Sequence, residues 1–227
     1  MGLWVFRSEL RRSDLSAEGV DAALVGVLGG LVGAKVVWAI EFRDEAPFLS
    51  LIFSRGGLSW FGGFLGGVGA GLWAPHRRRI PLMAALAAAA PALAIGHAIG
   101  RIGCFLVGDD YGRPTDLRWG VAFPEGLPPT SVPVPPTQLY ETAGLMLIAW
   151  ALIHMRRLSR PDVFVFGSYL VLAGTLRFLI EFIRVNAHVA GPFTVAHLFS
   201  AAIVSVGLSL IFVKREESQP NKPSISV

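Results

Sequence analysis

Charged side chains are scarce in this chain. Aspartate, glutamate, lysine and arginine make up 16% of its 227 residues, whereas hydrophobic residues make up 53%. A soluble domain carries about 25% charged residues, because its surface has to be covered with polar groups. This deficit, together with a mean hydropathy of +0.56, excludes a soluble globule and indicates an integral membrane protein.

Cysteine is almost absent as well. Cys104 is the single cysteine, which excludes an internal disulfide and any multi-cysteine metal site. The formal net charge is only +4, and basic residues in a membrane protein set its orientation. We therefore expect no nucleic-acid partner. A cleavable signal peptide is also not expected, because the basic N-terminal stretch has no apolar core followed by a small-residue cleavage site.

Long apolar runs are what the sequence has instead. A membrane-spanning helix needs about 20 apolar residues, and six segments approach that length. They lie near residues 20–40, 58–74, 82–103, 139–155, 164–183 and 193–213. The sequence thus predicts an all-α, polytopic membrane protein with about six transmembrane helices, forming one membrane-embedded domain over residues 1–227. Residues 214–227 are polar and are expected to form a disordered cytoplasmic tail.

The second segment is rich in glycine. Gly62 and Gly66, like Gly63 and Gly67, are four residues apart. Small residues at this spacing allow a neighbouring helix to approach the backbone closely. We interpret the pattern as a packing feature without chemistry.

Basic residues predict the orientation of the helices. With six spans, the clusters at residues 7–12, 77–79, 156–160 and 214–215 fall on one side, which the positive-inside rule makes cytoplasmic. The long loop between the third and fourth spans has more acids than bases and is placed outside, in the periplasm. Its charged residues are Asp109, Asp110, Asp116 and Glu125 against Arg113 and Arg118.

Three charges stand together near the end of the fifth segment. Arg177, Glu181 and Arg184 are spaced by four and three residues, so they share one helix face. A charged side chain at the bilayer centre costs about 2.5–3.5 kcal/mol, so the presence of each of these three charges needs an explanation. One reading is that Glu181 neutralises one arginine and leaves the other to bind an anion. The alternative is an ion-paired helix end whose side chains reach the headgroups, although Arg177 lies deep for that.

The third segment ends with a comparable pair. His97 and Arg101 are one helical turn apart and share a face near the outer surface. The alternative reading is an interfacial arginine beside a histidine that is satisfied locally. If Arg101 and Arg177 converge, two guanidinium groups suit a phosphodiester, because each donates paired hydrogen bonds to phosphate oxygens.

The remaining polar positions are less decisive. Lys35 lies mid-span with no carboxylate near it in sequence, and an acid of another helix is the partner we consider. Cys104 fits a small buried filler better than a nucleophile. Asp109 and Asp110 form either a solvated loop face or a base or orienting group for Arg101. Thr137 is predicted as the N-cap of the fourth helix, which places Gln138, Tyr140 and Glu141 in its first turns beside the outer surface.

Four ordered motifs resemble a known family. "GRIGCFLVGDDYG" at 100–112, "WGVAFP" at 119–124, "PTQLYE" at 136–141 and "RFLIEFIR" at 177–184 look like the motif series of the bacterial prolipoprotein diacylglyceryl transferases, and "GGLSWFGG" at 56–63 looks like their glycine-rich motif. The similarity runs from about the first span to the sixth.

The resemblance implies a reaction and its residues. Family enzymes transfer the diacylglyceryl group of phosphatidylglycerol to the lipobox cysteine of a prolipoprotein in the bacterial inner membrane, releasing glycerol phosphate, without metal or organic cofactor. Arg101 and Arg177 match the two arginines that would hold the phosphate as its charge grows, and Asp109 stands where the family has glutamate. Residues implied in substrate binding are Gln138, Tyr140, Glu141, Glu181 and Arg184.

The sequence departs from the family at three positions. Phe61 stands where the family has a histidine proposed as the base, Cys104 replaces an asparagine, and Pro135 replaces a histidine. The family's first membrane helix is also not evident. We hypothesise that His97 takes over as base. The alternative is a non-catalytic protein that binds anionic phospholipid on the same scaffold; a transporter is disfavoured, because the charges gather at the outer helix ends and not at the midplane.

Overall fold

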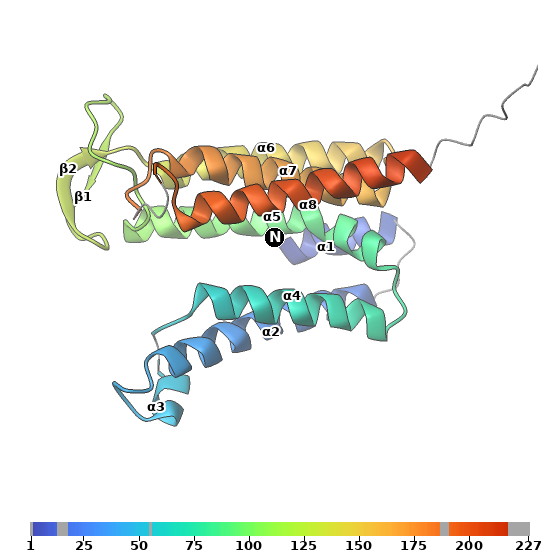
Figure 1. Cartoon of the computed structure of the whole chain (residues 1–227), viewed down its shortest axis with the longest axis horizontal. Helices are drawn as coiled ribbons and strands as arrows, with labels where there is room; N and C mark the ends of the chain where they lie inside the picture. The colour runs from blue at the N-terminus through green and yellow to red at the C-terminus, as the bar shows by residue number, and fades with distance from the viewer. Residues whose placement is uncertain (1, 13–17, 55, 187–190, 218–227) are drawn as a thin grey trace, which may run out of the picture. The chain divides into compact units, whose positions relative to one another are not determined.

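The computed structural model describes residues 2–12, 18–54, 56–186 and 191–217 (Figure 1). It confirms the all-α fold class, and each of the six predicted segments coincides with a long helix. Two compact units can be distinguished: residues 3–89, and residues 90–227 together with residues 1–2. The helices are α1 (Gly2–Arg12), α2 (Glu18–Glu41), α3 (Phe48–Ile52), α4 (Trp60–Arg77), α5 (Leu82–Val107), α6 (Thr137–Arg157), α7 (Asp162–Glu181) and α8 (Val195–Glu217).

The number of helices that meet a criterion of length and hydropathy for spanning a bilayer differs from the expected six. Among the described residues, four helices are long and apolar enough to cross a bilayer: Gly19–Glu41 in α2, Leu82–Val107 in α5, Asp162–Glu181 in α7 and Val195–Phe212 in α8. Helix α4 falls short because glycine contributes little hydropathy and its last turn carries His76 and Arg77. Helix α6 falls short because polar residues open it and basic residues close it.

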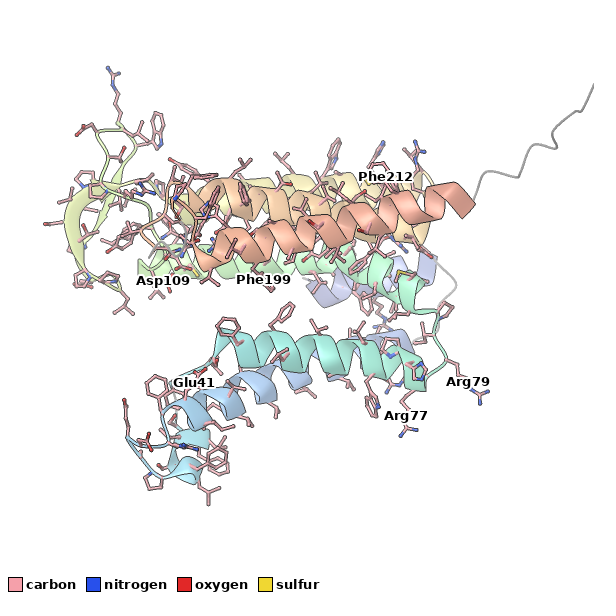
Figure 2. The ribbon with its side chains drawn as sticks, viewed as in Figure 1. Glu41, Arg77, Arg79, Asp109, Phe199 and Phe212 are labelled. Carbon is pink, nitrogen blue, oxygen red and sulfur yellow. The ribbon has the colours of Figure 1, made fainter. Side chains whose placement is uncertain are left out.

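Helices α2 and α4 of the first unit pack through glycine. A Cβ atom on Gly29 would lie 2.8 Å from the carbonyl oxygen of Gly66, and one on Gly62 would overlap the carbonyl oxygen of Gly33. The predicted close approach at the α4 glycines is therefore confirmed. The sequence interpretation missed that α2 supplies a matching glycine face. In the same unit, Glu41 and Arg77 lie at opposite ends of this helix pair (Figure 2).

Lys35 has partners of an unexpected kind. Its Nζ donates to the carbonyl oxygens of Ser54 and Gly56 at 3.0 and 2.5 Å and to Ser54 Oγ at 3.0 Å. It also lies 4.6 Å from the centre of the Trp38 ring. The expected carboxylate partner was wrong: backbone carbonyls of the segment after α3 satisfy the ammonium group.

In the second unit, helix α7 lies between α6 and α8 in the packing and is in contact with both (Figure 1). Helix α6 meets α5 where Thr142 Oγ1 donates to the carbonyl oxygen of Ala98 at 3.3 Å. Helices α7 and α8 approach closely, because a Cβ atom on Gly207 would lie 2.8 Å from the carbonyl oxygen of Gly167. Leu145 and Leu152 of α6 are buried in the core of this unit.

The outer surfaces of these helices are apolar. Leu147 and Trp150 of α6 and Leu198 and Phe212 of α8 are exposed large hydrophobic residues. Phe212 is labelled in Figure 2. Such side chains are costly in water and favourable in lipid. The chain is accordingly a multi-pass membrane protein.

A short hairpin lies at the end of the second unit where α5 ends (Figure 1). Strand β1 (Val121–Phe123) pairs antiparallel with β2 (Thr130–Val134), with Val121 opposite Val134. The Phe123 ring stacks on Tyr111 at 5.6 Å between centroids. At the opposite end, α8 continues through residues 214–217, so the first part of the predicted tail is helical; residues 218–227 lie outside the described part.

Candidate active site

Arg101 of α5 is held between two carboxylates. Its Nη1 lies 2.7 Å from Asp110 Oδ2, in the loop just after α5, and its Nε lies 2.7 Å from Glu141 Oε2, in the first turns of α6. The guanidinium group thereby connects α5, its following loop and α6. Planar guanidinium groups favour such paired contacts with carboxylates.

Arg177 of α7 approaches the same glutamate from the other side. Its Nη1 lies 3.4 Å from Glu141 Oε1 and its Nη2 lies 2.9 Å from Glu181 Oε2. The structure therefore brings Arg101 and Arg177 together, one on each oxygen of Glu141. The space between the two arginines is occupied by this buried carboxylate.

Arg184, just beyond the end of α7, completes a closed circuit. Its Nε lies 3.6 Å from Glu181 Oε2, and its Nη2 contacts Asp110 Oδ1. The six side chains alternate in charge, and we call them the charge ring. In order around it they are Arg101, Asp110, Arg184, Glu181, Arg177 and Glu141.

The charge ring corrects one expectation. Glu181 was expected to neutralise one arginine and leave the other available for an anion. Instead its Oε2 faces both Arg177 and Arg184. With three guanidinium groups and three carboxylates, the ring is formally neutral, so an incoming anion has to compete with a carboxylate already in place.

Glu181 is further supported by residues that sequence reasoning missed. Its Oε1 accepts hydrogen bonds from Asn186 Nδ2 at 2.6 Å and Thr194 Oγ1 at 2.7 Å. The backbone N–H of Thr194 in turn donates to His197 Nδ1 at 3.1 Å. These residues stand outside the recognised motifs: Asn186 and Thr194 lie in the segment between α7 and α8, and His197 lies in the first turn of α8.

His197 is buried in an aromatic environment. The rings of Phe178, Phe182 and Phe193 lie 4.8, 4.5 and 5.5 Å from its ring centre. His197 Nδ1 acts as the acceptor of the hydrogen bond from the Thr194 backbone N–H. His197 thus serves as a fixed acceptor that holds Thr194 toward Glu181.

The first turn of α6 positions the aspartate loop. Thr137 Oγ1 donates to the carbonyl oxygen of Asp110 at 2.7 Å, and Gln138 Nε2 donates to that of Asp109. The predicted N-cap role of Thr137 was wrong: Pro136 holds the N-cap position, and the threonine side chain bonds the loop. Tyr140 also binds this loop: its hydroxyl oxygen accepts a hydrogen bond from Trp119 Nε1 at 2.6 Å.

Arg113 anchors the same loop to the end of α7, a contact that the sequence did not reveal. Its Nε and Nη2 donate to the carbonyl oxygens of Arg184 and Phe182 at 3.2 and 2.9 Å. A cation near the last carbonyls of a helix is favourable, because those groups have no partner within the helix. Arg113 therefore holds the backbone of Arg184 beside Asp110.

Asp110 remains ionised at neutral pH. Burial by itself would raise the pKa of its carboxyl group. The hydrogen bonds from Arg184 and Arg101 and their positive charges outweigh burial and hold that pKa below its ordinary value. Asp110 has a left-handed backbone, with φ of 61°, a conformation that aspartate tolerates better than most residues.

Comparison with known proteins identifies the family of this chain. A model of the prolipoprotein diacylglyceryl transferase family matches residues 1–213. The chain belongs to the prolipoprotein diacylglyceryl transferase family.

Relatives named phosphatidylglycerol–prolipoprotein diacylglyceryl transferase are similar over most of their length. One from Geobacter sulfurreducens is 32% identical over 218 residues, covering 93% of this chain and 82% of the relative. One from Cupriavidus metallidurans is 35% identical over 199 residues, covering 81% and 72%. One from Pseudomonas putida is 32% identical over 207 residues, covering 87% and 76%.

Within this member of the diacylglyceryl transferase family, two predicted catalytic residues stand outside the charge ring. His97 is exposed and makes no hydrogen bond within the part of the chain that is described. Asp109 lies at the end of α5 (Figure 2); its Oδ1 is buried and has no hydrogen-bond partner among the described residues. It is Asp110, and not Asp109, that pairs with Arg101.

The family departures fall in different surroundings. Cys104 Sγ lies 3.7 Å from Arg101 Nη1, and its sulfur and the carboxylates of Asp109 and Asp110 come within 4.8 Å of one another. These donors suit a cation poorly, because Arg101 and Arg184 already place positive charge on Asp110. Pro135 acts through its backbone, accepting a hydrogen bond from Gly112 N at 3.2 Å. Phe61 lies on α4 and is exposed.

Proposed function

We propose that this protein transfers the diacylglyceryl group of phosphatidylglycerol to the lipobox cysteine of prolipoproteins. Its relatives carry the name of that reaction. The observation that carries the proposal is the pair Arg101 and Arg177, which different helices place on the two oxygens of Glu141. Arg101 also pairs with Asp110 in the loop after α5, whose side chain is exposed, and a lipid headgroup and a peptide can meet there.

In the proposed reaction the substrate thiol loses its proton and its sulfur attacks the glyceryl carbon bonded to the phosphate oxygen. A carbon–sulfur bond forms, the carbon–oxygen bond breaks, and glycerol phosphate leaves with the bonding electrons. Arginine side chains stabilise the charge that grows on the departing phosphate. No described residue needs to supply more than a proton acceptor and this charge stabilisation.

We propose that His97 is the base that accepts the proton of the substrate thiol. It lies one turn before Arg101 on α5, and its exposed ring has no competing hydrogen bond among the described residues. A thiol has a pKa of about 8.5, so a neighbouring imidazole and the positive arginines together favour the thiolate. Phe61 stands where the family has its histidine, which leaves this task to another group.

The experiment is a transfer assay with purified protein, phosphatidylglycerol and a lipobox peptide. We expect the peptide to gain the mass of a diacylglyceryl group and glycerol phosphate to appear. Arg101→Ala and Arg177→Ala each abolish the product, His97→Ala reduces it strongly, and Arg118→Ala, an exposed arginine of the same loop, leaves it unchanged. Wild-type protein that binds the lipid and yields no product would favour the lipid-binding alternative.

We further propose that the charge ring faces the periplasmic side of the bacterial inner membrane. Glu141 lies near the start of α6, whereas Arg156 and Arg157 lie in its last turn, and basic residues favour the cytoplasmic side. In a Cys104→Ser background, a membrane-impermeant thiol reagent added to intact spheroplasts should label Asp116→Cys and spare Arg160→Cys. Labelling of the second variant instead would reverse the orientation.

A further inference from the structure

We propose that Asp110 occupies the phosphate subsite, and that the headgroup phosphate of an anionic phospholipid binds between Arg101 and Arg184 by displacing its carboxylate. The inference rests on the proposed function for the identity of the lipid. It moves the phosphate from the pair expected from sequence, Arg101 and Arg177, to a different pair of the charge ring.

The three carboxylates of the charge ring differ in how readily they can leave it. The side chain of Asp110 is 40% exposed, whereas those of Glu141 and Glu181 are 2% and 0% exposed. Glu181 also accepts hydrogen bonds from Asn186 and Thr194. Displacing either glutamate would leave a buried charge without solvent. Asp110 can rotate toward water while its backbone stays held by Thr137.

The Asp110 carboxylate presents the geometry that a phosphate would reproduce. One oxygen contacts Arg101 Nη1 and the other contacts Arg184 Nη2. A phosphodiester has two non-bridging oxygens on one atom, and these match the same pair of guanidinium groups. The Asp110 carboxylate therefore occupies the position between these two guanidinium groups that a phosphate would take.

Arg184 offers a donor that no described group uses. Its side chain is 6% exposed, and its Nη1 is buried without a hydrogen-bond partner in the described part of the chain. Buried donors of this kind normally find a partner. A phosphate carries more acceptor capacity than one carboxylate, so a bound headgroup can satisfy both Arg184 and Arg101.

Charge balance favours the replacement of the Asp110 carboxylate by a phosphate between Arg101 and Arg184. With Asp110 turned away, three arginines face two glutamates, and a singly charged phosphodiester restores neutrality. Between Arg101 and Arg177, by contrast, the buried Glu141 already contacts both guanidinium groups. A phosphate there would bring like charge against a carboxylate that cannot move into water.

The test measures binding and not turnover, so it can succeed or fail independently of the transfer activity. Detergent-solubilised protein is titrated calorimetrically with short-chain phosphatidylglycerol and, separately, with soluble glycerol phosphate. Asp110→Asn removes the competing charge with little change in size, and we expect the lipid to bind about tenfold more tightly. Asp116→Asn, which removes an exposed aspartate of the same loop, should match the wild type.

Two further variants separate displacement from misfolding. Asp110→Glu keeps a competing carboxylate and should stay near wild-type affinity. Asp110→Asn combined with Arg184→Gln should lose the gained affinity, because one side of the subsite is gone. Tighter binding of glycerol phosphate alone would mean that the subsite takes the free anion and not the lipid. Unchanged or weaker binding of both ligands by a folded Asp110→Asn protein would overturn the proposal.

Discussion

Replacing Glu141 with glutamine tests whether the charge ring holds the second unit together. Glu141 places Oε2 at 2.7 Å from Arg101 Nε and Oε1 at 3.4 Å from Arg177 Nη1, and its side chain is 2% exposed. The substitution keeps the size and removes the charge, so two largely buried guanidinium groups lose their shared partner. Removing one partner of a buried ion pair costs about 3–5 kcal/mol.

This cost is large enough to measure by thermal unfolding. A chain of this size shifts its melting temperature by about 2–4 °C per kcal/mol, so Glu141→Gln should melt at least about 6 °C below the wild type. Tryptophan fluorescence of protein in one detergent, at one scan rate, gives the comparison. Glu125→Gln, an exposed glutamate of the same unit, controls for the loss of a negative charge.

The double variant Glu141→Gln/Arg177→Gln sharpens this test. It removes one charge of each sign and returns the charge ring to neutrality, so its destabilisation should be smaller than the sum of the two single variants. Contacting residues typically couple by about 0.5–3 kcal/mol. Additive effects, or a Glu141→Gln shift no larger than that of Glu125→Gln, would refute the view that these contacts stabilise the unit.

Three further outcomes are expected. The pKa of the Asp110 carboxyl group is lowered in the folded protein. The ionised carboxylate therefore stabilises the fold above its unfolded-state pKa of about 3.9, and this stabilisation is lost as pH falls through the folded-state pKa. Melting temperatures below pH 5 should fall more steeply with pH for the wild type than for Asp110→Asn. Thr194→Val removes the hydroxyl that bonds Glu181 and should cost about 1.5–3 kcal/mol in the same assay; an unchanged melting temperature would count against this bond. Gly62→Ala should destabilise strongly because its Cβ would overlap the Gly33 carbonyl, whereas Gly69→Ala, where nothing lies within 4 Å, should not; equal melting temperatures would contradict the close packing of α2 and α4.

Much of the fold could be predicted because apolar run length and glycine spacing are local properties. The helix from Leu82 to Val107 begins where the apolar run begins, and it continues past the predicted end at 103. The number of helices that meet a hydropathy criterion for spanning was harder to predict. The glycine-rich helix α4 and the polar-ended helix α6 are long enough to span, but their mean hydropathy is too low. The short helix α3 could not be predicted, because its five residues are too few to show a helical repeat of apolar positions.

The site was predictable to the extent that it is local in sequence. The spacing of Arg177, Glu181 and Arg184 places them on one face, and the structure has them in contact. The contact between Asp110 and Arg184 joins residues 74 positions apart, and no pattern in the sequence specifies it. The partners of Lys35 were also unpredictable, since they are backbone carbonyl groups, which every residue possesses.

The alternation of the charge ring has a consequence for biosynthesis. Read in the order of translation, its members are Arg101, Asp110, Glu141, Arg177, Glu181 and Arg184. Their running sum passes through plus one, zero, minus one, zero, minus one and zero. The nascent chain therefore never exposes more than a single uncompensated unit from this set as its helices emerge. The charges are compensated in consecutive pairs, Arg101 by Asp110, Glu141 by Arg177 and Glu181 by Arg184. This order limits the electrostatic penalty of inserting arginines into a lipid phase.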